Sequence, residues 1–300
     1  MIFENIVLVI GLIGLGTLMK NSSIFPKNSA DVLNQFVLNI SLPAIIILSI
    51  SKIKINFDML IPIGVHWVSF IFHTLFILLI SRLLKFSKKI TGALLIVSTL
   101  GNTAFLGIPM IKAFLGVEAI SYGVLYDQLG TGISYIILGA FVLPVYTNSE
   151  KKAFIQVLKD LLMFPPFVGL VLGFLFIYIS LPFIIENFLE SVAGTLVPLA
   201  MIAVGFQMKY KIPKRILLPL GVGLWTKLII IPLFSYLLIT FVGSDSVAAK
   251  TSVLQSGMPP LITSGAIAIN ANLEKELCAS LVGYGLIFSF ISLNIIKYLL

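Results

Sequence analysis

The sequence predicts an all-α membrane protein of ten transmembrane helices, arranged as two inverted five-helix repeats in which helices 4 and 9 are broken and cross. Three observations support this prediction. The composition is 59% hydrophobic and only 11% charged, and the mean hydropathy of +1.11 is too high for a water-soluble domain of this size. Long apolar runs recur along the chain, and prolines and glycines occupy matching places in its two halves.

Ten apolar segments can each supply the roughly 20 residues of a membrane-spanning helix, some with help from flanking residues. One of them contains a single charge, Lys227, and the other nine are uncharged. They cover residues 5–19, 32–51, 59–81, 90–111, 128–149, 161–185, 191–208, 216–244, 251–273 and 277–296. No gap between them is large enough for a soluble domain, so we expect the function to lie within the membrane. Because Glu4 stands where a signal peptide is basic, we expect the first segment to be retained.

The first three helices contain few candidates for a site. Gly11, Gly14 and Gly16 in helix 1 favour close helix packing over ligand binding. Helix 2 carries Asn39 next to Pro43, and this asparagine is a candidate to face a cavity. Helix 3 contains both histidines, His66 and His73, which lie on one helix face; two lone histidines make a poor metal site, so we interpret them as packed or interfacial.

Helix 4 is interrupted within residues 98–116, where Gly101, Asn102, Thr103, Gly107 and Pro109 stand in place of ordinary helix formers. Proline removes a backbone donor and glycine adds conformational freedom, so we expect the helix to break here. Lipid cannot hydrogen-bond the freed backbone groups, and such a break is therefore buried in protein or lines a polar cavity. A simple proline kink with no ligand is the alternative interpretation.

Two charged side chains lie inside predicted helices, where ionisable groups are functional candidates. Helix 5 is expected to extend from about 119 to 146, beyond its uncharged run, and it therefore contains Asp127 followed by Gln128. Asp127 is the best candidate for a proton carrier; a satisfied structural pair or a position near the outer interface is the alternative. Lys227, about a dozen residues into helix 8, is a candidate to counter an anionic substrate or to replace a coupling cation. Its alternative is structural pairing with Asp127.

The two halves of the chain match at a nearly constant offset, which indicates an internal duplication. Pro43 pairs with Pro198 at 155 residues, and Gly101 with Gly257 at 156 residues. The triplet Pro62, Gly64 and Val65 pairs with Pro219, Gly221 and Val222 at 157 residues. We expect one repeat over residues 1–148 and the second over 149–300. Because five helices is an odd number, the second repeat is inverted, which is typical of a secondary transporter with its site at the midplane.

Helix 9 contains the second interruption. In the inverted-repeat arrangement helices 4 and 9 run in opposite directions, so their two breaks can cross near the centre of the bilayer. Pro109 in helix 4 and Pro259 or Pro260 in helix 9 can each start a half-helix, whose free N–H groups and dipole then point at the crossing. Each such end favours an anion by ~0.3 to 1 kcal/mol at exposed sites. The neutral hydrogen-bonding candidates there are Asn102, Thr103, Gln255 and Ser256. No nucleophile with its base is present, so we do not expect an enzyme.

The net charge of +8 is explained by membrane topology, and we expect no nucleic-acid partner. With both termini outside the cell, most basic residues fall in cytoplasmic loops, as the positive-inside rule requires. These are Lys20, Lys27, Arg82, Lys85, Lys88, Lys89, Lys151, Lys152, Lys159, Lys209, Lys211, Lys214, Arg215 and Lys275. The single cysteine, Cys278, excludes an internal disulfide and is interpreted as a packing residue; we expect no metal or other cofactor.

At its two interruptions the sequence resembles the auxin efflux carrier family, and the similarity extends over almost the whole chain. The segment 101–116, with its Asn-Thr and Gly-Ile-Pro elements, is its most specific part, and residues 257–260 and the pair Leu42 and Pro43 also agree. The chain is similar to the prokaryotic, malate-permease-like members of this family and of the bile acid/arsenite/riboflavin transporter superfamily. The long cytoplasmic loop of plant members and an acidic sodium site in helix 9 are absent.

The resemblance implies a scaffold domain and a moving transport domain, each built from both repeats, and a homodimer. It also implies that Asn102 meets the substrate carboxylate and that Pro109 and Pro259 are the crossover prolines. The resulting hypothesis is a cell-membrane secondary active transporter or facilitative carrier of small organic anions, such as malate, which works by elevator-like alternating access with proton coupling as an option. The alternatives are a sodium or proton antiporter of related fold and a non-transporting membrane sensor.

Overall fold

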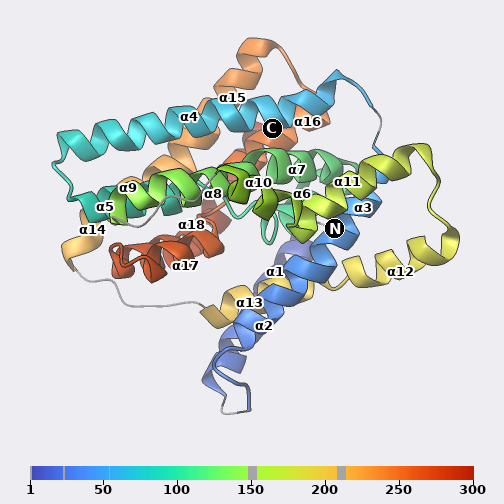
Figure 1. The fold of residues 1–300 in the computed structure, drawn as a ribbon, viewed down its shortest axis with the longest axis horizontal. Helices are drawn as coiled ribbons and strands as arrows, with labels where there is room; N and C mark the ends of the chain where they lie inside the picture. Colours follow the sequence, from blue (N-terminus) through green and yellow to red (C-terminus); the bar gives the residue numbers. More distant parts are fainter. Residues whose placement is uncertain (1, 23, 54, 148–153, 208–213) are drawn as a thin grey trace. The chain divides into compact units, whose positions relative to one another are not determined.

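The computed structural model describes residues 2–22, 24–53, 55–147, 154–207 and 214–300, and every regular element in these ranges is a helix (Figure 1). Within these described ranges, six helical runs are long and apolar enough to span a membrane, which confirms a multi-span, all-α membrane protein. They are Ser29–Ser51, Phe57–Leu83, Val117–Thr147, Phe183–Phe206, Lys214–Val242 and Lys275–Leu299.

The other predicted spans differ in length or continuity. The helix α1 (Ile2–Asn21) covers the segment predicted at 5–19. The helix α11 (Pro165–Tyr178) is shorter than the segment predicted at 161–185. Predicted helix 4 is split into a helical run of α5 (Lys88–Ala93) with η3 (Leu94–Ser98), and a separate helix α6 (Gly107–Leu115). Predicted helix 9 is split into α16 (Val247–Ser256) and α17 (Ile262–Asn270). The expected helix breaks are therefore confirmed at both places.

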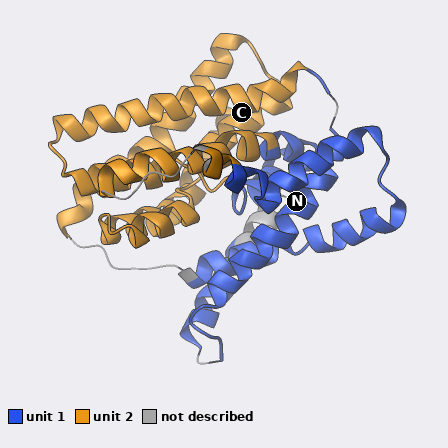
Figure 2. Ribbon diagram, viewed as in Figure 1, with its two compact units in different colours: residues 1–56, 104–124, 159–208 blue, residues 57–103, 125–158, 209–300 orange. Residues whose placement is uncertain are grey.

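Two compact units make up the chain, and each takes segments from both halves of the sequence (Figure 2). Unit 1 comprises residues 1–56, 104–124 and 159–208, and unit 2 comprises residues 57–103, 125–158 and 209–300. The expected boundary between repeats at 148 and 149 lies outside the described residues, as do Lys151, Lys152, Lys209 and Lys211.

Unit 1 consists mainly of α1, α2 (Ser29–Phe36), η1 (Val37–Ser41), α3 (Leu42–Ser51), α6, α11, α12 (Phe183–Ala193) and α13 (Leu196–Gln207). Its helices approach closely where glycine replaces a side chain. A Cβ atom added at Gly16 would lie 2.1 Å from the carbonyl oxygen of Ile202, and one added at Gly205 would lie 2.0 Å from that of Ile13. The prediction of close packing is confirmed for Gly16, whereas a Cβ atom added at Gly11 or Gly14 would meet no atom of the described residues within 4 Å.

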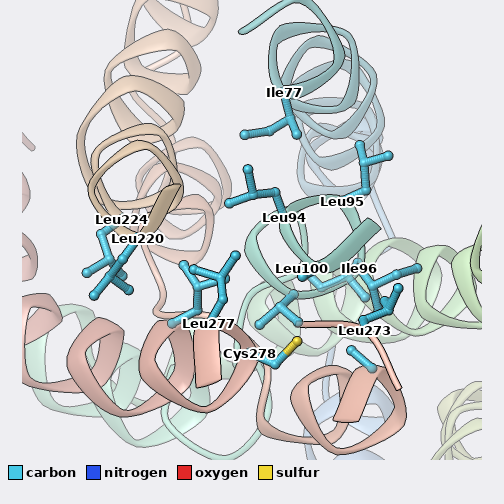
Figure 3. Close-up of a cluster of buried hydrophobic side chains, with 14 of the residues drawn as sticks. Ile77, Leu94, Leu95, Ile96, Leu100, Leu220, Leu224, Leu273, Leu277 and Cys278 are labelled. Atoms are coloured by element: carbon cyan, nitrogen blue, oxygen red, sulfur yellow. The ribbon is translucent and has the colours of Figure 1, made fainter. Parts of the chain in front are cut away.

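Unit 2 contains α4 (Leu60–Leu83), α5, η3, η5 (Asp127–Gly132), α8 (Ile133–Ile137), η6 (Leu138–Val142), α9 (Leu143–Thr147), α14 (Leu217–Trp225), η8 (Thr226–Ile230), α15 (Ile231–Val242), α16, α17 and α18 (Lys275–Leu299). Its apolar core packs η3 against α14 and α18 (Figure 3). Leu94, Leu100, Leu220 and Leu277 are buried there, and Cys278 lies among them as predicted. This core holds the first half of broken helix 4 firmly within unit 2.

Candidate functional site

The two helix breaks meet inside unit 2 and satisfy each other's backbone. The N–H of Asn102 donates to the carbonyl oxygen of Pro259 at 2.7 Å, and the N–H of Leu261 donates to the carbonyl oxygen of Leu100 at 3.1 Å. Gly101 thereby pairs with Pro260 as an isolated antiparallel bridge. Because a bilayer offers no partners for free backbone groups, this pairing explains how both helices can stop at this depth. We call this pairing of residues 100–103 with 255–261 the crossing.

Side chains tie the crossing to Asp127. The side-chain Nε2 of Gln255 donates to the carbonyl oxygen of Thr103 at 3.1 Å, and the hydroxyl of Thr103 donates to Oδ1 of Asp127. The Nε2 of Gln128 donates to Oδ2 of Asp127 at 2.5 Å. Both oxygens of this carboxyl group, which is only 7% exposed, therefore accept hydrogen bonds from neutral donors.

Lys227 contributes the positive charge. Its Nζ donates to the carbonyl oxygen of Ser256 at 3.0 Å, and the residue is only 3% exposed. A Cβ atom added at Gly101 would lie 3.2 Å from Nζ, so the ammonium group also lies against the first break. Within the part of the chain that the structure describes, Lys227 makes no ion pair. Structural pairing with Asp127, the alternative for Lys227, is therefore wrong.

The two buried charges share a feature of their backbone. Asp127 begins the π-helical turn η5, and Lys227 lies in the π-helical turn η8. Such turns are rare inside helices and are frequent at functional sites, because they shift a side chain out of the ordinary helical register.

Asn102 presents a polar group that the crossing does not use. Its side chain is 1% exposed, and its Oδ1 atom has no hydrogen-bond partner among the described residues. Its backbone N–H, by contrast, is engaged with Pro259. Buried polar groups are normally paired, and an unpaired one in a native structure calls for an explanation such as a ligand. The amide of Asn102 is therefore the part of the crossing best suited to receive a ligand.

The prolines of helix 9 do not start the second half-helix, and this expectation is wrong. Helix α17 begins at Ile262, after Leu261, which has an extended conformation with φ −66° and ψ 128°. Each residue before a proline is disfavoured in the helical region, so the consecutive prolines at 259 and 260 disfavour a helical conformation at Met258 and Pro259. Pro259 serves the crossing through its carbonyl oxygen, and the hydroxyl of Ser256 is occupied by a bond to the carbonyl oxygen of Val253 at 2.7 Å.

Three predicted site residues belong to unit 1. Gly107 is the first residue of α6 and Pro109 the third, so α6 starts two residues before the proline. Asn39 is exposed, and its Nδ2 donates to the carbonyl oxygen of Gln35 at 2.7 Å. The structure brings together the other eight, all in unit 2: Asn102, Thr103, Asp127, Lys227, Gln255, Ser256, Pro259 and Pro260.

Sequence reasoning missed Gly285, which lies in α18 against the crossing. A Cβ atom added there would lie 2.5 Å from Cδ and 3.1 Å from Cγ of Pro260. Since the partner lies 25 positions earlier in the chain, no local pattern could reveal this contact.

We expect Gly285→Ala to destabilise the protein by about 1–3 kcal/mol, because the proline ring is rigid and overpacking costs energy of that order. The measurement is the midpoint of thermal unfolding in detergent. The matched control is Gly221→Ala in α14, where an added Cβ meets no atom within 4 Å. Equal unfolding midpoints for Gly285→Ala and Gly221→Ala would contradict a close contact between Gly285 and Pro260.

Comparison with known proteins identifies a family of membrane transport proteins. The profile of the family described as membrane transport protein matches residues 1–297. An uncharacterized transporter of Methanothermobacter thermautotrophicus is 25% identical over 294 residues, which cover 97% of this chain and 95% of the relative. An uncharacterized transporter of Methanocaldococcus jannaschii is 24% identical over 300 residues, covering 96% and 95% of the two chains. The lysosomal cholesterol signaling protein of Mus musculus is 27% identical over 308 residues, which cover 93% of this chain but 35% of the relative.

Proposed function

Since the chain belongs to the membrane transport protein family, which includes the auxin efflux carriers, we propose that it is a secondary carrier of small organic anions, such as malate and other mono- or dicarboxylates. The observation that carries this proposal is the buried ammonium group of Lys227 at the crossing. It makes no ion pair among the described residues and donates only to a neutral carbonyl. A buried cation without a carboxylate partner favours an anionic ligand.

In this proposal the carboxylate of the substrate binds at the crossing. The amide of Asn102 supplies a hydrogen bond to it, and Lys227 supplies the compensating charge. Thr103 and Gln255 hold the two breaks together through the bonds already described, so they position the site. Asp127 is the candidate coupling group, because a single buried carboxylate can carry one proton per transport cycle.

The mechanism we propose is elevator-like alternating access, with unit 2 as the moving transport domain and unit 1 as the scaffold. Both units draw on both halves of the chain, as two intertwined repeats over 1–148 and 149–300 would require. The proposal includes ten membrane-spanning segments, with the split helices 4 and 9 counted as spans, both termini outside the cell, and a homodimer in the cell membrane. It requires no cofactor.

The test is transport in proteoliposomes. Wild-type protein is expected to move at least one member of a panel of labelled mono- and dicarboxylates, and Asn102→Ala is expected to lower kcat/KM for it by about tenfold or more, since a hydrogen bond to a charged group is worth about 1.5–3 kcal/mol. Asn294→Ala is the control, because that amide lies in α18 and bonds to the carbonyl oxygen of Phe290. Unchanged kinetics in Asn102→Ala would remove this residue from the site.

Two other functions have some support. Asp127, a buried carboxylate at the crossing, is what a sodium or proton antiporter requires, and flux that depends on sodium and not on an organic anion would favour that function. A non-transporting sensor is supported by the similarity to a protein named for cholesterol signaling. Ligand binding in detergent combined with no flux in proteoliposomes would favour the sensor.

A further inference from the structure

A small polar cavity lies inside unit 2, next to Lys227. Its volume is about 10 Å³ for the centre of a water molecule, which is roughly the room that one water requires. Residues of α4, of the first break, of α7 (Ile120–Tyr126), of η5, of η8 and of α15 line it: His66, Ser69, Phe70, His73, Thr99, Gly101, Tyr126, Thr131, Lys227 and Ile231. Asn102 does not line it but Lys227 does, so this cavity adjoins the part of the crossing assigned to the substrate.

Four of these lining residues have hydrogen-bonding capacity that the described residues do not use. The Nδ1 atoms of His66 and His73 and the hydroxyl of Thr131 are buried and have no partner in the described ranges. Lys227 uses one of the three donors of its ammonium group on Ser256. The hydroxyl of Ser69, by comparison, already bonds to the hydroxyl of Ser235 at 2.9 Å.

The hydrogen bonds of His73 determine which of its ring nitrogens is free to accept. The hydroxyl of Thr226 lies 2.9 Å from the carbonyl oxygen of Val222 and 3.0 Å from that of Gly223. A carbonyl can only accept, so we assign the single hydroxyl proton to one of them, and with this assignment the hydroxyl oxygen accepts from Nε2–H of His73 at 3.2 Å. In the neutral ring this leaves a lone pair on Nδ1. The cavity therefore offers a cationic donor and a neutral acceptor.

This combination fits water and not an anion, which would meet the lone pair of His73. We propose that the cavity binds a single water molecule that accepts a hydrogen bond from Nζ of Lys227 and donates one to Nδ1 of His73. Thr131 and Nδ1 of His66 provide two further partners, so the water reaches the two to four hydrogen bonds typical of buried water. The water hydrates a buried ammonium group that has no carboxylate partner among the described residues. His73 is thus a positioning residue for Lys227.

The experiment is an experimental structure of the full chain at a resolution that shows ordered water, with a parallel data set from protein equilibrated with bromide. We expect a density peak within hydrogen-bonding distance of both Nζ of Lys227 and Nδ1 of His73, and no anomalous bromide signal there. An empty cavity would overturn the proposal, and so would a bromide peak, which would identify an anion as the occupant.

Solid-state NMR of protein with ¹⁵N-labelled histidine provides an independent measurement that does not depend on transport. In wild type, Nδ1 of His73 is expected to resonate as a hydrogen-bonded acceptor, and in Lys227→Met its resonance is expected to move toward that of a free pyridine-type nitrogen. The control is Ser81→Ala, which removes another buried hydroxyl of α4 that does not line the cavity. A His73 resonance that is the same in all three proteins would contradict the water bridge. If Lys227→Met does not fold, the wild-type density decides the question.

Discussion

Gly205→Ala is expected to prevent α1 and α13 from packing at their observed distance and to destabilise unit 1. The added Cβ would lie 2.0 Å from the carbonyl oxygen and 2.8 Å from the carbonyl carbon of Ile13. Backbone atoms cannot rotate away as a flexible side chain can, so the helices must separate. Overpacking of a well-packed interior costs about 1–3 kcal/mol where side chains can adjust, and here the cost should reach or exceed the upper end of that range.

Gly16→Ala should have the same effect from the other helix, since its Cβ would lie 2.1 Å from the carbonyl oxygen of Ile202. Close approach of helix backbones at small residues is a main source of helix association in membranes, where the hydrophobic effect between helices is absent. The measurement is the yield of monodisperse protein and the thermal unfolding midpoint in detergent.

Gly14→Ala is the matched control for this pair. It lies on α1, two residues before Gly16, and an added Cβ there meets no atom within 4 Å. Alanine is also the better helix former by about 1 kcal/mol in a helix interior, so Gly14→Ala should be neutral or slightly stabilising. Similar loss of stability in Gly14→Ala and Gly16→Ala would show that general helix propensity, and not the contact with Ile202, sets the effect.

The three glycines of α1 show a limit of prediction from sequence. Helix periodicity places Gly11, Gly14 and Gly16 in one apolar helix, but only the packing partner distinguishes Gly16 from the others. That partner, α13, lies about 190 residues later in the chain, and no local pattern specifies where two helices touch.

The helix breaks were predictable because their cause is local. Proline and glycine within an apolar run weaken the helix wherever the run is placed, and the structure interrupts both runs near Gly101 and Gly257. The details of the crossing were not predictable in the same way. Whether Pro259 starts a helix or stays extended depends on the residue that follows it and on the bond that its carbonyl forms with Asn102. The partner of Lys227 was also missed, because a backbone carbonyl leaves no mark in the sequence.

Lys227→Met is expected to raise KM for the transported carboxylate by roughly 10- to 150-fold, because a hydrogen bond to a charged group contributes about 1.5–3 kcal/mol and each 1.4 kcal/mol is a factor of ten. Methionine retains most of the length of the side chain and removes only the charge and its donors. The measurement is the concentration dependence of uptake in proteoliposomes with a substrate identified from the carboxylate panel.

The stability of the same variant separates loss of binding from loss of fold. Burying an unpaired charge is costly, and replacing it with an apolar side chain of similar volume is often neutral or stabilising. The thermal unfolding midpoint of Lys227→Met should therefore equal or exceed that of wild type while transport falls. The control is Lys250→Met in α16, which removes a lysine whose Nζ lies 3.0 Å from Oδ1 of Asp245, an exposed carboxylate. Such surface pairs are worth about 0–1 kcal/mol, so its uptake should match wild type. An unchanged KM in Lys227→Met would show that the buried ammonium group does not bind the substrate, and the anion-carrier proposal would then lose its main support.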